Sequence, residues 1–285
     1  SSLTNPEYKA PLHLRKIARV LERVERGELK RVIITIPPRH GKSMLISTYF
    51  PAFYLGRNPA RYIITSTYGQ ELSDGFGRRV REQIQGEAFK TLFPACRLNT
   101  DTRAANRMET TLGGSYYGVG AQGPITGRGG HLILLDDLIK NREEADSQLQ
   151  RDKLYDWYRS VLYTRLMPGG AIVVIQTRWH EDDLVGRLLR DQAHENWTVI
   201  NMPALNETGE ALWPDQYSAE DMLRIRATLQ EYDWQCVYQQ SPIPPEGIIV
   251  RPDWIKSGLN QDAHGYASVM IGVDPAIGQN EQNDE

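Results

Sequence analysis

The fold of this chain is decided by the stretch Ile33-Ile34-Thr35-Ile36-Pro37-Pro38-Arg39-His40-Gly41-Lys42-Ser43. Its first half is apolar and β-branched, as in a buried strand, and the strand ends at two prolines. The chain then turns through Gly-Lys-Ser into the helix-compatible run Met44 to Phe50. In such loops backbone N–H groups face an anion, a lysine bridges the outer phosphates and a serine hydroxyl reaches Mg²⁺. The pattern therefore predicts a loop that binds nucleotide phosphates, formed by Pro38, Arg39, His40, Gly41, Lys42 and Ser43.

The match to the phosphate-loop pattern is partial, because Ile36 stands where the first glycine is usual. The alternative is an ordinary turn between a strand and a helix. The strand before the loop and the helical run after it favour phosphate binding, since the motif requires that context. Arg39 and His40 are expected to add cationic donors where most such loops carry small residues. A solvated loop arginine is the alternative for Arg39.

Composition limits the class of protein. The chain has 285 residues, of which 40% are hydrophobic and 24% charged, as in ordinary globular domains. No apolar run approaches the roughly 20 residues of a membrane span, so no membrane partner is expected. Cys96 and Cys236 are far apart, which favours a reducing compartment without a disulfide framework. The net charge of -3 does not exclude nucleic acid, because a motor that slides along DNA needs only local, weak phosphate contacts.

Strands and helices alternate along the chain. Near-continuous Ile, Val and Leu suggests buried strands at 31–36, 61–67, 131–135, 171–176 and 197–202. Helical periodicity appears at 13–27, 42–55, 70–85, 147–162 and 181–192, and residues 109–119 read as a hairpin around Gly113-Gly114. This order predicts an α/β fold with a mostly parallel sheet and helices on both faces, of the P-loop NTPase (ASCE) type.

The domain organisation changes late in the chain. Residues 1–204 are expected to form the P-loop core, and residues 205–247 a small helical subdomain with a Pro-rich linker. Residues 219–240 read as one helix within it. At 266–275 a new strand ends in Asp274. Residues 248–285 therefore read as the start of a further domain.

Two carboxylates follow the strand 131–135. Asp136 stands at the tip of a buried strand, where P-loop enzymes hold Mg²⁺, usually through water. Asp137 takes the place of the acid that orients the attacking water, although that acid is normally Glu. Glu143 or Glu144 could reach in instead. The alternative is a strand end that merely caps the next segment.

The strand 171–176 also ends in polar residues. Gln176 and Thr177 can sense a γ-phosphate or its water, because both donate and accept hydrogen bonds. The alternative is helix capping by Thr177. The acidic residues 181–183 are expected on the surface, where the helix dipole favours them.

Two further groups could complete a nucleotide site. Arg128 lies in the glycine-rich loop before the strand 131–135 and could act as an arginine finger on a neighbouring subunit, or as a phosphate- or DNA-contacting residue. Tyr8, Lys9 and His13 could flank an adenine ring, with a plain surface as the alternative. Arg78, Arg79 and Arg81 are candidates for gripping DNA, or a solvated helix face.

Three stretches together resemble the ATPase part of the large terminases of tailed bacteriophages: PPRHGKS (37–43), GRGGHLILLDDLIKNREEADS (127–147) and QTRWHEDDLVGRLL (176–189). The resemblance runs from about Tyr8 to Gly278. It implies an ATP- and Mg²⁺-dependent motor that packages double-stranded DNA into a procapsid, joined to an RNase H-like nuclease. The implied partners are a portal protein, a small terminase subunit and further copies in a pentameric ring. The implied location is the cytoplasm of the infected bacterial host, transiently at the procapsid portal.

The resemblance assigns roles by position. Lys42 and Ser43 match the phosphate-loop pair, Arg39 the extra arginine, and Asp274 the first metal-binding aspartate of the nuclease. Asp136-Asp137 match the strand-end acids, and Gln176-Thr177 the position that couples hydrolysis to movement. The remaining nuclease acids are missing from this sequence, so nuclease activity is not expected. Two other functions stay open: a superfamily 2-like helicase or translocase, and a nucleotide-binding assembly module that does not hydrolyse.

Overall fold

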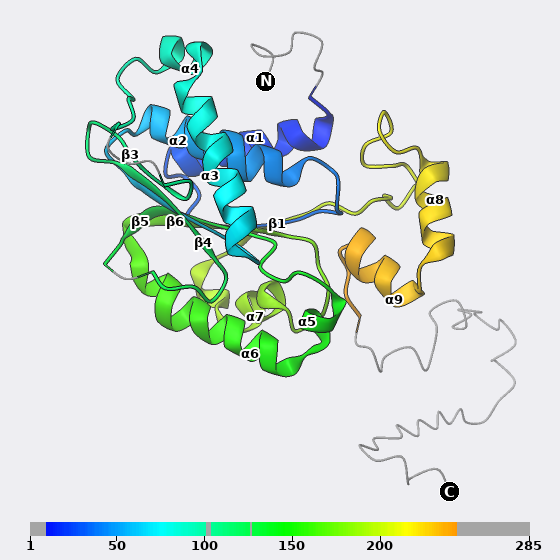
Figure 1. Ribbon diagram of the computed structural model, residues 1–285. Coiled ribbons are helices and arrows are strands. Elements are labelled where there is room, and N and C mark those ends of the chain that lie inside the picture. The colour runs from blue at the N-terminus through cyan, green and yellow to red at the C-terminus, as the bar shows by residue number, and fades with distance from the viewer. Residues whose placement is uncertain (1–9, 101–103, 126, 244–285) are drawn as a thin grey trace, which may run out of the picture. The chain divides into compact units, whose positions relative to one another are not determined.

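A computed structural model describes residues 10–100, 104–125 and 127–243. All of them belong to the first of two compact units, Ser1–Pro245 and Glu246–Glu285. The centre of this unit is a seven-stranded sheet in the order β3-β4-β2-β5-β6-β1-β7 (Figure 1). The strands are β1 (Arg31–Thr35), β2 (Tyr62–Thr67), β3 (Arg107–Glu109), β4 (Ser115–Gly120), β5 (Gly130–Asp136), β6 (Leu166–Gln176) and β7 (Thr198–Asn201).

All neighbouring strands are parallel except β3, which runs antiparallel to β4. The predicted parallel sheet and the hairpin are therefore confirmed. The described helices are α1 (Leu12–Glu25), α2 (Phe50–Arg57), α3 (Gln70–Gln85), α4 (Glu87–Leu92), α5 (Arg142–Asp146), α6 (Gln148–Trp157), α7 (Leu184–Asp191), α8 (Ala219–Thr228) and α9 (Glu231–Asp233). Short 3₁₀ or π-helical turns complete the description: η1 (Met44–Tyr49), η2 (Tyr158–Leu162), η3 (Tyr163–Arg165), η4 (Ala193–Glu195) and η5 (Trp234–Tyr238).

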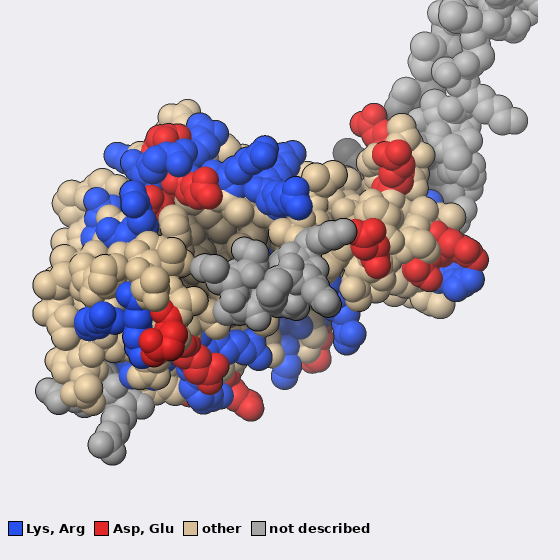
Figure 2. Space-filling model, turned by 90° about the horizontal axis from the view of Figure 1, so that it is seen from above, with Lys and Arg blue, Asp and Glu red and all other residues tan. Residues whose placement is uncertain are grey.

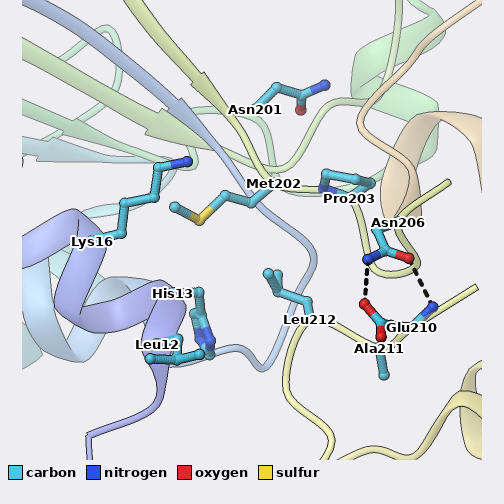
Figure 3. Close-up of a pocket in the computed structure, with 10 residues that line it drawn as sticks. All are labelled: Leu12, His13, Lys16, Asn201, Met202, Pro203, Asn206, Glu210, Ala211 and Leu212. Atoms are coloured by element: carbon cyan, nitrogen blue, oxygen red, sulfur yellow. Dashed lines mark hydrogen bonds between the residues drawn. The ribbon is translucent and has the colours of Figure 1, made fainter. Parts of the chain in front are cut away.

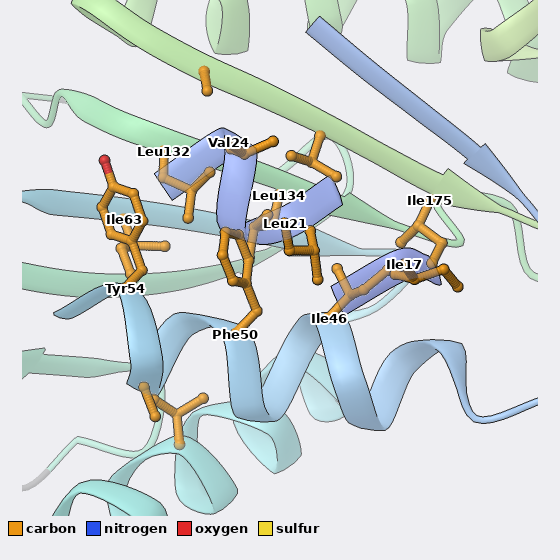
Figure 4. Packing of buried hydrophobic residues seen from close by; sticks show 14 of the residues in the cluster. Ile17, Leu21, Val24, Ile46, Phe50, Tyr54, Ile63, Leu132, Leu134 and Ile175 are labelled. Atoms are coloured by element: carbon orange, nitrogen blue, oxygen red, sulfur yellow. The ribbon is translucent and has the colours of Figure 1, made fainter. Parts of the chain in front are cut away.

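Helices cover both faces of the sheet, because alternate strand residues point to opposite sides. On one face α1, η1, α2 and α3 bury the larger cluster. Figure 4 shows residues of this cluster from α1, from η1 and α2, and from the strands: Ile17, Leu21, Val24, Ile46, Phe50, Tyr54, Ile63, Leu132, Leu134 and Ile175. On the other face Ile133 and Val174 pack with residues of α6 and α7, such as Leu154 and Leu188.

The sheet register brings several strand tips together. Thr35 at the end of β1 pairs with Gln176 at the end of β6, and Asp136 at the end of β5 pairs with Ile175. On the other side Asp136 pairs with Thr67 of β2. In open parallel sheets, ligands bind in the crevice at the carboxyl ends of the strands. The residues singled out at the tips of β1, β5 and β6 therefore share one edge.

Three expected helices differ from the structure. The helix expected at 181–192 begins only at Leu184, since Asp183 is its N-cap. The first turn after the phosphate-loop motif is π-helical, and regular α-helix begins at Phe50. The helix expected at 219–240 is broken, because Leu229 and Gln230 adopt extended conformations between α8 and α9.

The segment after β7 packs partly on itself. Ala204, Leu205, Met222 and Trp234 form a small cluster separate from the two sheet faces. The boundaries expected near residues 204 and 247 stay a prediction. In the part of the chain that the structure describes, no helix has the length and apolar character needed to cross a bilayer.

Candidate nucleotide-binding site

The loop of residues 36–43 joins the end of β1 to η1. Two of its residues have left-handed backbones: Arg39 with a φ of 61° and Gly41 with a φ of 80°. Turns that combine left- and right-handed residues form concave anion-binding surfaces. Gly41 also meets α1 closely, because a Cβ there would lie 3.0 Å from Cδ1 of Leu14. The loop thus has a curled backbone suited to an anion.

Lys42 joins this loop to the tips of two other strands. Its side chain is buried, its Nζ donates to Oγ1 of Thr177, and the same Nζ lies 2.8 Å from Oδ2 of Asp137. Burial of an ammonium group is costly unless an anion is paired with it. The three residues expected at the outer phosphates therefore meet at one point.

Asp136 is buried beside this lysine and accepts two hydroxyl hydrogen bonds. Ser43 Oγ donates to Oδ1 at 3.1 Å, and Ser47 Oγ donates to Oδ2 at 2.6 Å. Burial raises the pKa of Asp136 to about 6, and the neighbouring charge of Asp137 adds to the shift. A buried carboxylate next to a serine hydroxyl suits Mg²⁺, which prefers oxygen ligands and commonly takes one or two carboxylates plus substrate phosphates.

Asp137 has both carboxylate oxygens engaged. Oδ2 pairs with Lys42, and Oδ1 accepts from the backbone N–H of Thr177 at 2.8 Å. Its backbone is left-handed, with a φ of 45°, which is uncommon for a residue other than glycine. Glu144 accepts from the backbone of Lys140 at 3.0 Å. The assignment of the catalytic base stays a prediction.

Gln176 and Thr177 lie directly beside the phosphate loop. The backbone oxygen of Gln176 accepts from Ile36 N–H at 3.3 Å, and Oγ1 of Thr177 lies 3.3 Å from the carbonyl oxygen of Ile36. Thr177 does not cap a helix, so the capping alternative is wrong. The cap of α7 is Asp183, whose Oδ1 accepts from Gly186 N–H at 3.0 Å.

Two expectations about charged residues near the loop are also wrong. Asp183 is not on the surface: it is buried, and its Oδ2 accepts from Nε of Arg178 at 2.8 Å. His40 adds no cation, because burial lowers its pKa. Its Nδ1 lies 2.8 Å from the carbonyl oxygen of Pro38, and its own carbonyl oxygen accepts from His13 Nε2 at 2.9 Å. Arg39, by contrast, is exposed.

Residues 33–234 match a family model described as terminase large subunit, T4likevirus-type, N-terminal. The chain belongs to this terminase family. The match includes the phosphate-loop motif, both strand-end acids and the segment that carries α8. No curated protein matches the sequence.

Solved structures of phage terminases share the fold. The HK97 bacteriophage large terminase aligns with a TM-score of 0.58 at 10% identity, over 82% of this chain and 51% of that one. The ATPase domain of the Thermus phage P74-26 large terminase aligns with a TM-score of 0.53 at 14% identity, over 79% and 93%. The large terminase of another thermophilic bacteriophage gives 0.51 at 11% identity, over 81% and 53%. The chain thus spans about half the length of the HK97 protein.

Arg128 lies far from Lys42 in this terminase chain. It precedes β5, whereas Asp136 ends it, and a strand of this length spans about 20 Å. The guanidinium group packs 4.4 Å from the ring centre of Tyr117 in β4. The structure therefore does not bring Arg128 to the other site residues of its own chain.

A pocket of about 330 Å³ lies beside the loop, between the start of α1 and the segment after β7 (Figure 3). His13 both lines it and contacts the backbone of His40. The lining mixes apolar and polar side chains: Leu12, His13, Lys16, Asn201, Met202, Pro203, Asn206, Glu210, Ala211 and Leu212. Tyr8 and Lys9, proposed beside His13, lie outside the described residues, as does Asp274.

The segment after β7 contacts the site at three places. Gln240 Oε1 accepts from the backbone N–H of Arg178 at 3.0 Å, next to Thr177. Arg142 pairs with Asp233, and its guanidinium lies 5.4 Å from the ring centre of Trp179. The rings of His40 and Tyr217 lie 5.3 Å apart. Sequence reasoning missed these contacts, because residues so far apart in the chain carry no pairing signal.

Basic side chains are patchy on the surface. The exposed side of α1 carries Arg15, Lys16, Arg19, Arg23 and Arg26, of which the last two pair with Glu28. Figure 2 shows Lys and Arg interleaved with Asp and Glu on the side of the molecule that it presents. Of the three arginines of α3, Arg81 donates to the backbone oxygens of Ala104 and Arg107, while Arg78 and Arg79 are exposed.

Proposed function

We propose that this chain is the Mg²⁺-dependent ATPase part of a viral DNA-packaging motor. The observation that carries the proposal is the position of Lys42: its ammonium joins the loop after β1 to Asp137 and Thr177, at the tips of β5 and β6. P-loop NTPases place a lysine, a metal-associated acid and a water-positioning residue around a γ-phosphate in this way. The related Thermus phage domain is named an ATPase domain.

Each residue then has a role. The backbone of 38–43 and Lys42 bind the phosphates, and Arg39, exposed above the loop, adds a cation. Ser43 and Asp136 would hold the magnesium ion, which neutralises charge on the phosphates when bound. Asp137, Gln176 and Thr177 orient the attacking water and register the γ-phosphate. Arg128 acts on the site of a neighbouring subunit.

The pocket between α1 and the segment after β7 is proposed to receive the base of the nucleotide. It adjoins the loop through His13, and apolar side chains such as Leu12 and Met202 suit the faces of an aromatic ring. Asn201 and Asn206 are polar groups that can hydrogen-bond to ring nitrogens. The nucleotide would then extend from this pocket toward Lys42.

Movement is proposed to pass from the γ-phosphate to the segment after β7. Thr177 contacts Lys42, and the next residue, Arg178, donates its backbone N–H to Gln240. A shift of residues 176–178 on hydrolysis therefore acts directly on the end of the helical segment, which would push DNA. The partners are double-stranded DNA, a portal protein, a small terminase subunit and a pentameric ring of copies. The motor would act in the cytoplasm of the infected bacterium, at the procapsid portal.

Titration calorimetry with Mg-ATP tests the proposal, together with phosphate release. Wild-type chain is expected to bind and to hydrolyse ATP, and Lys42→Ala to abolish turnover, because the lysine bridges the outer phosphates. Lys153→Ala, an exposed lysine on α6, is the matched control and should behave as wild type. Hydrolysis near the wild-type rate in Lys42→Ala would contradict the assignment.

A second candidate is a nucleotide-binding assembly module without productive hydrolysis. It is favoured by Asp137, whose two carboxylate oxygens are held by Lys42 and by the backbone of Thr177. A carboxylate engaged in this way is a weaker base. Phosphate release measured with and without DNA at raised protein concentration separates the two, since only the motor turns over.

A further inference from the structure

Ser47 makes a contact that the phosphate-loop pattern does not require. Its Oγ donates to Oδ2 of Asp136 at 2.6 Å, while Ser43 Oγ donates to Oδ1 of the same carboxylate at 3.1 Å. Ser47 and Asp136 are both almost fully buried, at 2% exposure each. Hydrogen bonds from hydroxyl groups to a carboxylate are among the stronger ones in proteins. The two serines thus hold the two oxygens of one acid.

The helix after the loop explains this arrangement. Positions 43 and 47 are four residues apart, so both side chains lie on the same face. That face is turned toward the tip of β5. The turn is π-helical at this point, with Phe50 N–H bonded to the carbonyl of Leu45, and π-helical turns are frequent at functional sites. The neighbouring hydroxyl of Thr48 is also buried but has no hydrogen-bond partner among the described residues.

We propose that Ser47 is a positioning residue that orients the Asp136 carboxylate for magnesium. This rests on the proposed function, in which Ser43 and Asp136 hold the ion. A serine hydroxyl that turns to a metal no longer donates to Asp136. The terminal torsion of an aspartate is broad, so the carboxylate is then free to rotate unless another donor holds it. Ser47 supplies that donor and keeps Oδ1 on the side of Ser43.

The test compares binding of a non-hydrolysable ATP analogue with Mg²⁺ and with EDTA, by titration calorimetry. The loop backbone and Lys42 do not depend on Ser47, so affinity in EDTA is expected to be unchanged in Ser47→Ala. The gain in affinity that Mg²⁺ produces is expected to fall about tenfold, as for the loss of a hydrogen bond to a charged group. Thr48→Val, which removes the adjacent unpaired hydroxyl with its shape kept, should match wild type.

Ser47→Cys keeps the volume with a weaker donor, and an intermediate loss of the Mg²⁺ gain is expected there. Thermal unfolding of each variant checks the fold. A full Mg²⁺ gain in Ser47→Ala would overturn the inference alone, as would an equal loss in Thr48→Val. If the wild-type chain bound no analogue under either condition, the proposed function would fail and the inference with it.

Discussion

At the scale of single residues, the site is a set of short polar contacts around one lysine. Lys42, Asp137 and Thr177 come from three separate segments and meet in a buried position. Asp136 lies beside them with a raised pKa, caused first by burial. Such displaced ionisation is typical of functional sites, because a fold tolerates a costly buried carboxylate where its chemistry is used.

The catalytic base can be identified by substitution. Asp137→Asn is expected to lower kcat about 10²-fold or more, the usual contribution of a general base. The amide still accepts from Thr177 N–H, so nucleotide affinity should change little. Turnover at saturating Mg-ATP is the measurement, with Glu143→Gln and Glu144→Gln in parallel. If one of these glutamate variants lost turnover and Asp137→Asn kept it, the base would be that glutamate.

At the scale of elements, the loop between β6 and α7 is held by a buried ion pair. Asp183 caps α7 and pairs with Arg178, whose backbone in turn donates to Gln240. The same loop carries Thr177 at its start. The elements that respond to the nucleotide and those that contact the helical segment are therefore built from one short stretch.

Asp183→Ala should destabilise this stretch. Removal of the cap costs about 1 kcal/mol, and an unpaired buried Arg178 adds about 3 kcal/mol. Asp183→Asn keeps the cap and should lose less. Urea unfolding measures the difference, with the exposed Glu181→Ala as control. A change below about 0.5 kcal/mol, usual for surface sites, would show that the ion pair contributes little.

The contact between α1 and the phosphate loop should depend on pH. Burial lowers the pKa of both His13 and His40 below the ordinary value, so the unfolded chain takes up protons first as pH falls. Stability from these neutral rings is present above about pH 6.5 and is lost below it.

In urea unfolding at pH 7.5 and 5.5, His13→Gln should therefore lose less stability on acidification than wild type. Glutamine can still donate to the His40 carbonyl but carries no titrating group. His194→Asn, at an exposed histidine, is the control. Equal acid sensitivity in wild type and His13→Gln would remove this histidine from the explanation.

At the scale of the whole molecule, the sheet separates Arg128 from the site of its own chain. The loop before β5 opens at one edge of the parallel sheet, and Lys42, Asp136 and Thr177 lie at the other. An arginine at that edge can serve a nucleotide only through assembly with another copy. Turnover is then a property of the ring rather than of one subunit.

Mixing of two inactive variants tests this arrangement. Arg128→Ala alone should lose about 10³-fold or more in rate, as for other arginine fingers, and Lys42→Ala alone should be inactive. In a mixture, the arginine of a Lys42→Ala subunit can complete the intact site of an Arg128→Ala neighbour. Phosphate release should then exceed the sum of the separate variants. A strictly additive rate would place Arg128 outside the reaction.

Much of this architecture could be predicted because its signals are local. Buried strands read as continuous Ile, Val and Leu, and Gly-Lys-Ser after such a strand predicts a phosphate loop. Parallel strands align their carboxyl ends, so Asp136, Gln176 and Thr177 could be expected near Lys42 from their positions at strand ends alone. The length of β5 also contains the separation between Arg128 and Asp136.

The remaining features depend on contacts between distant segments. Burial of Asp183 and of His40, the hold of Ser47 on Asp136 and the bond from Arg178 to Gln240 arise from packing that no local pattern encodes. By itself the sequence determined the sheet, the loop and the residues at the strand tips, since these follow from periodicity and spacing. Only the tertiary structure decided which side chains are buried and paired there, because that depends on which faces the elements turn to one another.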